Sequence, residues 1–163
     1  MAIKASKIGM GGGCHWCTEA VFNSLKGVLK VEQGYISSFG ENKTFSEGII
    51  IHYNPAEISL HDLVNVHLHT HASTAAHSFR EKYRSAIYSF DPEEINEVEN
   101  ILYALQKDFE CPLITQPLSF RHFKASRESL WHYYEKHEKG PFCQRYIIPK
   151  LKLINAHFKE LEQ

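Results

Sequence analysis

The sequence predicts an α+β protein with a ferredoxin-like α/β plait, a mixed sheet with helices packed on it. Apolar runs of strand length and segments with apolar residues at helical spacing follow one another in the order βαββαβ. Glycine, proline and asparagine mark the turns between them, and no internal repeat or linker interrupts the pattern. We therefore expect a single domain over residues 1–163, with C-terminal helical segments added to the core.

The first half of the chain supplies the elements βαββα. Residues 3–10 form an apolar run typical of a strand, and the three glycines after it precede a helix. Residues 28–37 alternate apolar and polar side chains, while residues 46–53 contain three consecutive isoleucines, as expected of a buried strand. Ser59 is a good N-cap for a helix that runs to about residue 69.

The second half begins with a further strand over residues 84–90. Asp91 and Pro92 then provide the cap and the first residue of a long helix. Residues 113–118 are expected to form a strand, and Pro117 within it favours an edge position. The last elements are expected to be two helices, over residues 126–137 and 149–161.

Composition excludes several classes of function. A chain of 163 residues with 43% hydrophobic and 23% charged residues can bury a well-filled core. Its formal net charge of −1 gives no electrostatic reason to expect nucleic acid or an anionic membrane as a partner. No stretch approaches the roughly 20 apolar residues of a membrane helix, and residues 1–10 do not resemble a signal peptide. We therefore expect a cytoplasmic location.

Cys14 is the strongest candidate for a functional residue. It follows three glycines at the expected turn from strand to helix, where free N–H groups and the helix dipole favour a thiolate. The glycines allow a tight turn and leave room for a ligand to approach. The four cysteines of the chain are too few and too irregularly spaced for a secreted disulfide scaffold. The pattern therefore predicts a reactive cysteine.

Cys14 and Cys17 also form a Cys-x-x-Cys pair, which redox dithiols and half zinc sites share. A zinc site needs two more ligands, which histidines between residues 67 and 77 offer. No second Cys-x-x-Cys pair supports this reading. The sequence therefore favours a reactive cysteine, either in a redox dithiol or as a nucleophile with a coincidental neighbour, and a small Cys/His metal-binding protein is the alternative.

Residues 13–19, Gly-Cys-His-Trp-Cys-Thr-Glu, resemble the Gly-Cys-Phe-Trp-Gly-x-Glu signature of the A-type peptide methionine sulfoxide reductases. Gly34-Tyr35, Ser46-Glu47, the run Tyr-Arg-Ser-Ala-Ile-Tyr at 83–88 and Gly-Pro-Phe-Cys at 140–143 follow in the family's order. The resemblance thus covers nearly the whole chain. It implies a related α/β plait and the thiol-dependent reduction of methionine S-sulfoxide, free or in peptides, with no cofactor.

The resemblance also implies a role for each site residue. Cys14 attacks the sulfoxide sulfur and is left as a sulfenic acid, while Glu47 occupies the position of the proton donor. Tyr35 and Tyr83 match tyrosines whose hydroxyl groups hydrogen-bond the sulfoxide oxygen. Trp16 matches the ring that packs on the S-methyl group. Without the resemblance, Glu47 reads better as a surface carboxylate at a strand edge, and both tyrosines could be ordinary half-buried sheet residues. The place of Trp16, two residues after the predicted nucleophile, favours a pocket wall over a core position.

Three departures from the family pattern bear on the site. His15 replaces a phenylalanine of the methyl-binding wall, Ser78 replaces an aspartate that hydrogen-bonds the site, and Cys17 replaces a glycine. The loop that contains Ser78 is also shortened. The changes at His15 and Ser78 motivate a second alternative, a non-catalytic module that binds oxidised methionine.

Two cysteines are candidates for resolving the sulfenic acid into a disulfide. The resemblance selects Cys143, because residues 140–143 align with the family's Gly-Tyr-Cys segment. Cys17 lies one helical turn from Cys14, and redox motifs form disulfides at this spacing, so it stays open as the alternative. An external dithiol must then reduce the disulfide, and thioredoxin has a suitably low potential.

Overall fold

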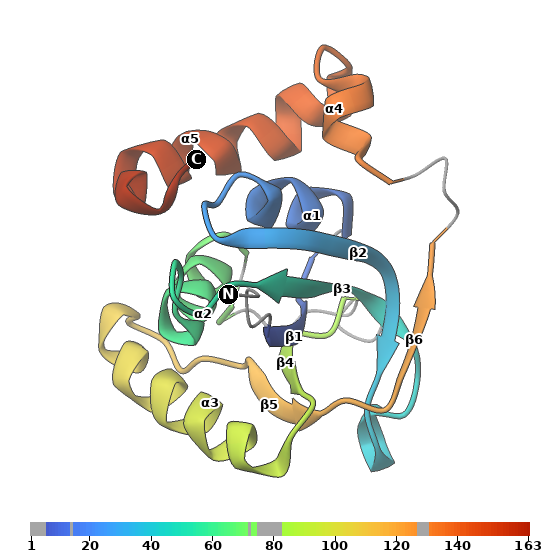
Figure 1. Ribbon diagram of the computed structural model, residues 1–163, viewed down its shortest axis with the longest axis vertical. Helices are drawn as coiled ribbons and strands as arrows, with labels where there is room; N and C mark the ends of the chain where they lie inside the picture. Colours follow the sequence, from blue (N-terminus) through green and yellow to red (C-terminus); the bar gives the residue numbers. More distant parts are fainter. Residues whose placement is uncertain (1–5, 14, 72, 75–82, 127–130) are drawn as a thin grey trace.

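The computed structural model describes residues 6–13, 15–71, 73–74, 83–126 and 131–163 (Figure 1). Cys14, Ser78 and His77 lie outside the described residues. The strands are β1 (Ser6–Gly11), β2 (Val28–Ser37), β3 (Ser46–Tyr53), β4 (Ala86–Ser89), β5 (Gln116–Ser119) and β6 (His122–Ala125). The α-helices are α1 (His15–Asn23), α2 (Leu60–His69), α3 (Pro92–Leu105), α4 (Tyr133–His137) and α5 (Ile148–His157).

The strands form one sheet in the order β5-β4-β1-β3-β2-β6. Its four central strands pair antiparallel, as a βαββαβ plait requires, and β5 joins β4 in parallel, which makes the sheet mixed. The predicted fold class is confirmed. β5 contains Pro117 and lies at one edge, as its proline indicated.

Helices α1, α2 and α3 pack on one face of the sheet. Alternate residues of β1 and β3, such as Met10 and Ile49, join one buried cluster with apolar side chains of α1, α2 and α3. The intervening residues, such as Ile50, point to the other face and a smaller cluster around Tyr88. Residues 49–51 are buried because the strand contributes to both clusters.

Local sequence signals fix several boundaries. The Ser59 hydroxyl accepts a hydrogen bond from the Asp62 N–H at 3.0 Å, so α2 begins where its N-cap predicted. The bounds of β2 and β3 also match the predicted ranges. No helix among the described residues is both long and apolar enough to cross a membrane.

The C-terminal part differs from the prediction. Residues 122–125 form β6, a strand that the sequence analysis did not predict. β6 pairs antiparallel with residues 34–37 of β2. Among the described residues, the expected helix over 126–137 is limited to α4. A π-helical segment, Cys143–Ile147, precedes α5, and Figure 1 shows these C-terminal helices lying over α1.

Candidate active site

The segment that contains the predicted nucleophile, residues 12–14, joins β1 to α1 in sequence. β1 ends at Gly11 and α1 begins at His15, so the predicted nucleophile directly precedes the first residue of α1 in sequence. Beside α1, Tyr35 of β2 lies directly opposite Glu47 of β3. Opposed residues of an antiparallel pair share a face, and Val31 opposite Ile51 places this face under the helices. Tyr35 and Glu47 thus point to the α1 side of the sheet.

His15 connects α1 to both strands. Its backbone N–H donates to Glu47 Oε1 at 3.2 Å, which satisfies one of the N–H groups that a helix start leaves open. Its ring Nδ1 lies 3.0 Å from the Gly34 carbonyl oxygen and 3.5 Å from Glu47 Oε1. The ring meets Tyr35 edge-on at 5.4 Å between centroids. His15 and Glu47 are both buried, at 3% and 7% exposure.

Tyr83 is half-buried shortly before β4. The next residue, Arg84, donates its backbone N–H to Ser46 Oγ at 2.7 Å, and Ser46 directly precedes Glu47. The Arg84 guanidinium is buried and donates to the Thr44 carbonyl oxygen and hydroxyl. The segment with Tyr83 is therefore anchored to the start of β3. The role of Arg84 and Ser46 was not foreseen, although both lie in the family motifs.

The C-terminal segment reaches the same end of α1. The Trp16 ring meets Phe142 edge-on at 5.2 Å between centroids. Cys17 and Cys143 are both buried and belong to one apolar cluster with Ala20 and Ile147. The structure therefore brings both candidate resolving cysteines to α1.

The environment of Cys143 favours its thiol form. Burial raises the pKa of the Cys143 thiol, and the nearby Glu138 carboxylate raises it further. Because the thiolate is the nucleophile in disulfide chemistry, the raised pKa lowers the fraction of Cys143 that can attack at neutral pH. An attack by Cys143 on a sulfenic acid is thus favoured by higher pH.

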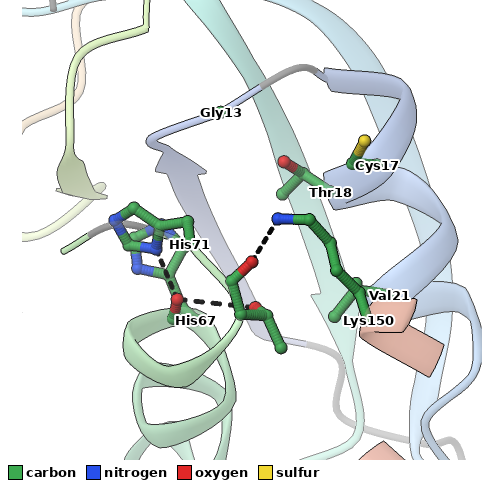
Figure 2. A pocket seen from close by; sticks show the side chains of 8 residues that line it. Gly13, Cys17, Thr18, Val21, His67, His71 and Lys150 are labelled. Carbon is green, nitrogen blue, oxygen red and sulfur yellow. Dashed lines mark hydrogen bonds between the residues drawn. The ribbon is translucent and has the colours of Figure 1, made fainter. Parts of the chain in front are cut away.

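Two histidines support the glycine loop, residues 11–13: His67, in the last turn of α2, and His71, two residues after the helix ends (Figure 2). His67 Nε2 lies 2.7 Å from the Gly11 carbonyl oxygen, which can only accept, so Nε2 carries the hydrogen. His71 Nδ1 donates to the His67 carbonyl oxygen, and its Nε2 lies 2.7 Å from the Ser85 hydroxyl. The two rings are 4.2 Å apart between centroids. Thr115 extends the network through Ser85 at 2.8 Å.

These contacts bear on the metal alternative. Both ring nitrogens of His71 take part in hydrogen bonds within the protein. Across the ranges that the structure describes, no group of three or more His, Cys, Asp or Glu side chains could hold a metal ion. His67 and His71 line a cavity of about 10 Å³, which is the size of one water molecule. Figure 2 shows Thr18 and Lys150 opposite the two histidines.

Gly12→Ala is expected to destabilise the glycine loop. Gly12 has φ +153°, and a Cβ there would lie 2.5 Å from the hydrogen-bonded His71 ring. We expect the free energy of unfolding to fall by about 1–3 kcal/mol, measured by urea denaturation. Gly13→Ala is the matched control, because its Cβ would meet nothing within 4 Å. Equal stability of the two variants contradicts the packing argument.

Comparison with known proteins addresses the family. Residues 6–162 match the family model described as peptide methionine sulfoxide reductase. A Sulfolobus acidocaldarius protein named peptide methionine sulfoxide reductase MsrA is 27% identical, over 93% of this chain and 94% of that protein. The crystal structure of Mxr1 from Saccharomyces cerevisiae in reduced form has a TM-score of 0.76 at 22% identity, covering 86% of this chain and 90% of that chain. The crystal structure of Mxr1 in complex with Trx2 has a TM-score of 0.64 at 20% identity, covering 80% of this chain and 85% of that chain.

The family match spans nearly the whole chain and includes every motif on which the resemblance depended. It confirms the predicted enzyme class, an oxidoreductase that reduces methionine sulfoxide with thiols. The structural neighbours confirm the fold. The chain therefore belongs to the peptide methionine sulfoxide reductase family.

Proposed function

We propose that this chain reduces methionine S-sulfoxide, free or in peptides, with Cys14 as the nucleophile and Glu47 as the proton donor. One observation carries the assignment. The buried Glu47 carboxyl group lies opposite Tyr35 and accepts from the backbone N–H of His15, the residue that follows Cys14. A carboxyl group and a tyrosine side chain thus share one face of the sheet beside the first residue of α1, which supports a site where an oxygen atom is bound and protonated.

In the first half-reaction, the Cys14 thiolate attacks the sulfoxide sulfur and Glu47 protonates the oxygen. The sulfur–oxygen bond of the substrate breaks, the oxygen and proton end on Cys14 as a sulfenic acid, and the thioether leaves. The substrate sulfur is reduced by two electrons and the Cys14 sulfur is oxidised by two. Tyr35 and Tyr83 donate hydrogen bonds to the oxygen while it gains negative charge.

In the second half-reaction, a cysteine thiolate attacks the Cys14 sulfenic acid, a disulfide forms and the oxygen leaves as water. We propose Cys143 as this resolving cysteine, supported by its place in one cluster with Cys17 on α1. Cys17 is the alternative. A thioredoxin then returns the disulfide to two thiols, as the solved complex of Mxr1 with Trx2 supports. Such a reductant and four cysteines suit the cytoplasm.

Cys14→Ser is expected to abolish reduction, because a serine hydroxyl cannot take up the oxygen as a sulfenic acid. The measurement is methionine released from methionine S-sulfoxide with dithiothreitol as reductant, with the R epimer as control. Cys111→Ser, at an exposed cysteine, is the matched variant and should retain the activity. Turnover by Cys14→Ser contradicts the assignment, and binding of a sulfoxide peptide by the unaltered protein without product indicates the non-catalytic module.

Glu47→Gln is expected to slow the first half-reaction by about 10²–10⁴-fold, because the amide keeps the shape of the carboxyl group but supplies no proton of comparable acidity. The measurement is methionine formed in a single turnover without reductant. Glu32→Gln, on the neighbouring strand β2, is the control and should react at the original rate. An unchanged rate in Glu47→Gln assigns proton donation to another group.

Disulfide formation by Cys143 is expected to quicken by about tenfold per pH unit from pH 7 to 8, since its raised pKa leaves little thiolate at neutral pH. Glu138→Gln removes a carboxylate that raises this pKa and should quicken the step at pH 7. The disulfide is mapped by proteolysis after one turnover. A Cys14–Cys17 linkage, or an unchanged disulfide in Cys143→Ser, contradicts the choice of Cys143.

A further inference from the structure

The ring of His15 is the part of the site that the proposed reaction does not use. The family pattern has a phenylalanine there, and the sequence analysis expected His15 to line the pocket for the substrate methyl group. The structure instead gives the ring two polar neighbours. Nδ1 lies 3.0 Å from the Gly34 carbonyl oxygen and 3.5 Å from Glu47 Oε1.

The tautomer of His15 follows from these contacts. A carbonyl oxygen can only accept a hydrogen bond, so Nδ1 must carry a hydrogen to bind Gly34. That N–H group also lies within ion-pair distance of Glu47 Oε1. The edge-on contact with Tyr35 restrains the ring in this orientation.

The two N–H groups of His15 distinguish the two oxygens of Glu47. The backbone N–H donates to Oε1 at 3.2 Å, and ring Nδ1, whose hydrogen is donated to Gly34, lies 3.5 Å from the same atom. In a neutral carboxyl group the carbonyl-type oxygen is the better acceptor, so the acidic hydrogen belongs on Oε2. Oε1 accepts from the backbone N–H and lies close to the positive end of the ring N–H group, so it is kept as the acceptor.

We propose that His15 is a positioning residue for proton transfer, which holds Glu47 Oε1 as an acceptor and so keeps the transferable proton on Oε2. The inference rests on the proposed role of Glu47 as the proton donor. After Oε2 gives its proton to the sulfoxide oxygen, the carboxylate keeps the hydrogen bond from the backbone N–H of His15, with the ring N–H group close to Oε1. Its new negative charge is therefore stabilised without any movement of the protein. Phenylalanine at position 15 would keep only the backbone donor.

The test compares three substitutions of His15 that differ in the hydrogen-bond donor they supply. Asparagine places an amide N–H near the position of Nδ1, glutamine places it near Nε2, and phenylalanine supplies no side-chain donor. The measurement is methionine formed in one turnover without reductant, over a range of sulfoxide concentrations. Thermal unfolding of each variant checks that it is folded.

We expect His15→Phe and His15→Gln to lower the maximal single-turnover rate roughly tenfold or more, with the half-saturating sulfoxide concentration unchanged. His15→Asn should stay within about threefold of the original rate, because it restores a donor toward Oε1. The contrast between asparagine and glutamine decides the question even if the phenylalanine variant does not fold.

The chain contains its own control. His52 of β3 lies 2.7 Å from Glu32 of β2, a His–Glu pair on the same two strands as Glu47 and Tyr35. His52→Phe and His52→Gln should leave the single-turnover rate unchanged. A rate change in these variants as large as that at His15 assigns the effect to the sheet in general and overturns the inference.

Three other results also overturn the inference. The first is a His15→Phe variant that reacts at the rate of the unaltered protein. The second is a change in the half-saturating sulfoxide concentration alone, which indicates that His15 forms a wall of the methyl pocket. The third is equal rates in the asparagine and glutamine variants. Failure of the proposed function looks different, since Glu47→Gln would then react at the original rate. A slow Glu47→Gln with a fast His15→Phe rejects only the role of His15.

Discussion

The contact between the Glu47 carboxyl group and the first residue of α1 is the constraint that organises this site. A buried carboxyl group is destabilising unless its oxygens are hydrogen-bonded, and the backbone N–H of His15 donates to Oε1, with ring Nδ1 at 3.5 Å from the same oxygen. The same contact satisfies an N–H group at the start of the helix. This contact thus joins the start of α1, the predicted proton donor Glu47 and the residue that follows the predicted nucleophile.

The scaffold holds this contact from three sides. The β2–β3 register sets Tyr35 opposite Glu47, and the Gly34 carbonyl group restrains the His15 ring. The glycine loop rests on His67 and His71, whose hydrogen bonds fix both rings. The C-terminal segment closes the third side, with its aromatic contact to Trp16 and a cysteine whose raised pKa keeps it as a thiol. The same arrangement serves both half-reactions of the proposed cycle.

Local signals made much of this fold predictable. Alternation defined β2 and β3, and the side chain of Ser59 marked the start of α2. β6 was missed because its four residues include one large apolar side chain, so its conformation depends on pairing with β2. The motifs likewise indicated candidate site residues, of which the structure brings His15, Tyr35 and Glu47 together. The contact of His15 with Gly34 was not predictable, because it joins residues 19 positions apart through the β2–β3 register.

The central claim is that the Glu47 carboxyl group donates the proton to the sulfoxide oxygen. Infrared difference spectroscopy tests it most directly, when the protein without reductant is mixed with methionine S-sulfoxide. We predict the loss of one protonated-carboxyl band as the sulfenic acid forms, and no such loss in Glu47→Gln. Sulfenic acid formation without any change in a carboxyl band, or the same band loss in Glu47→Gln, would contradict the account.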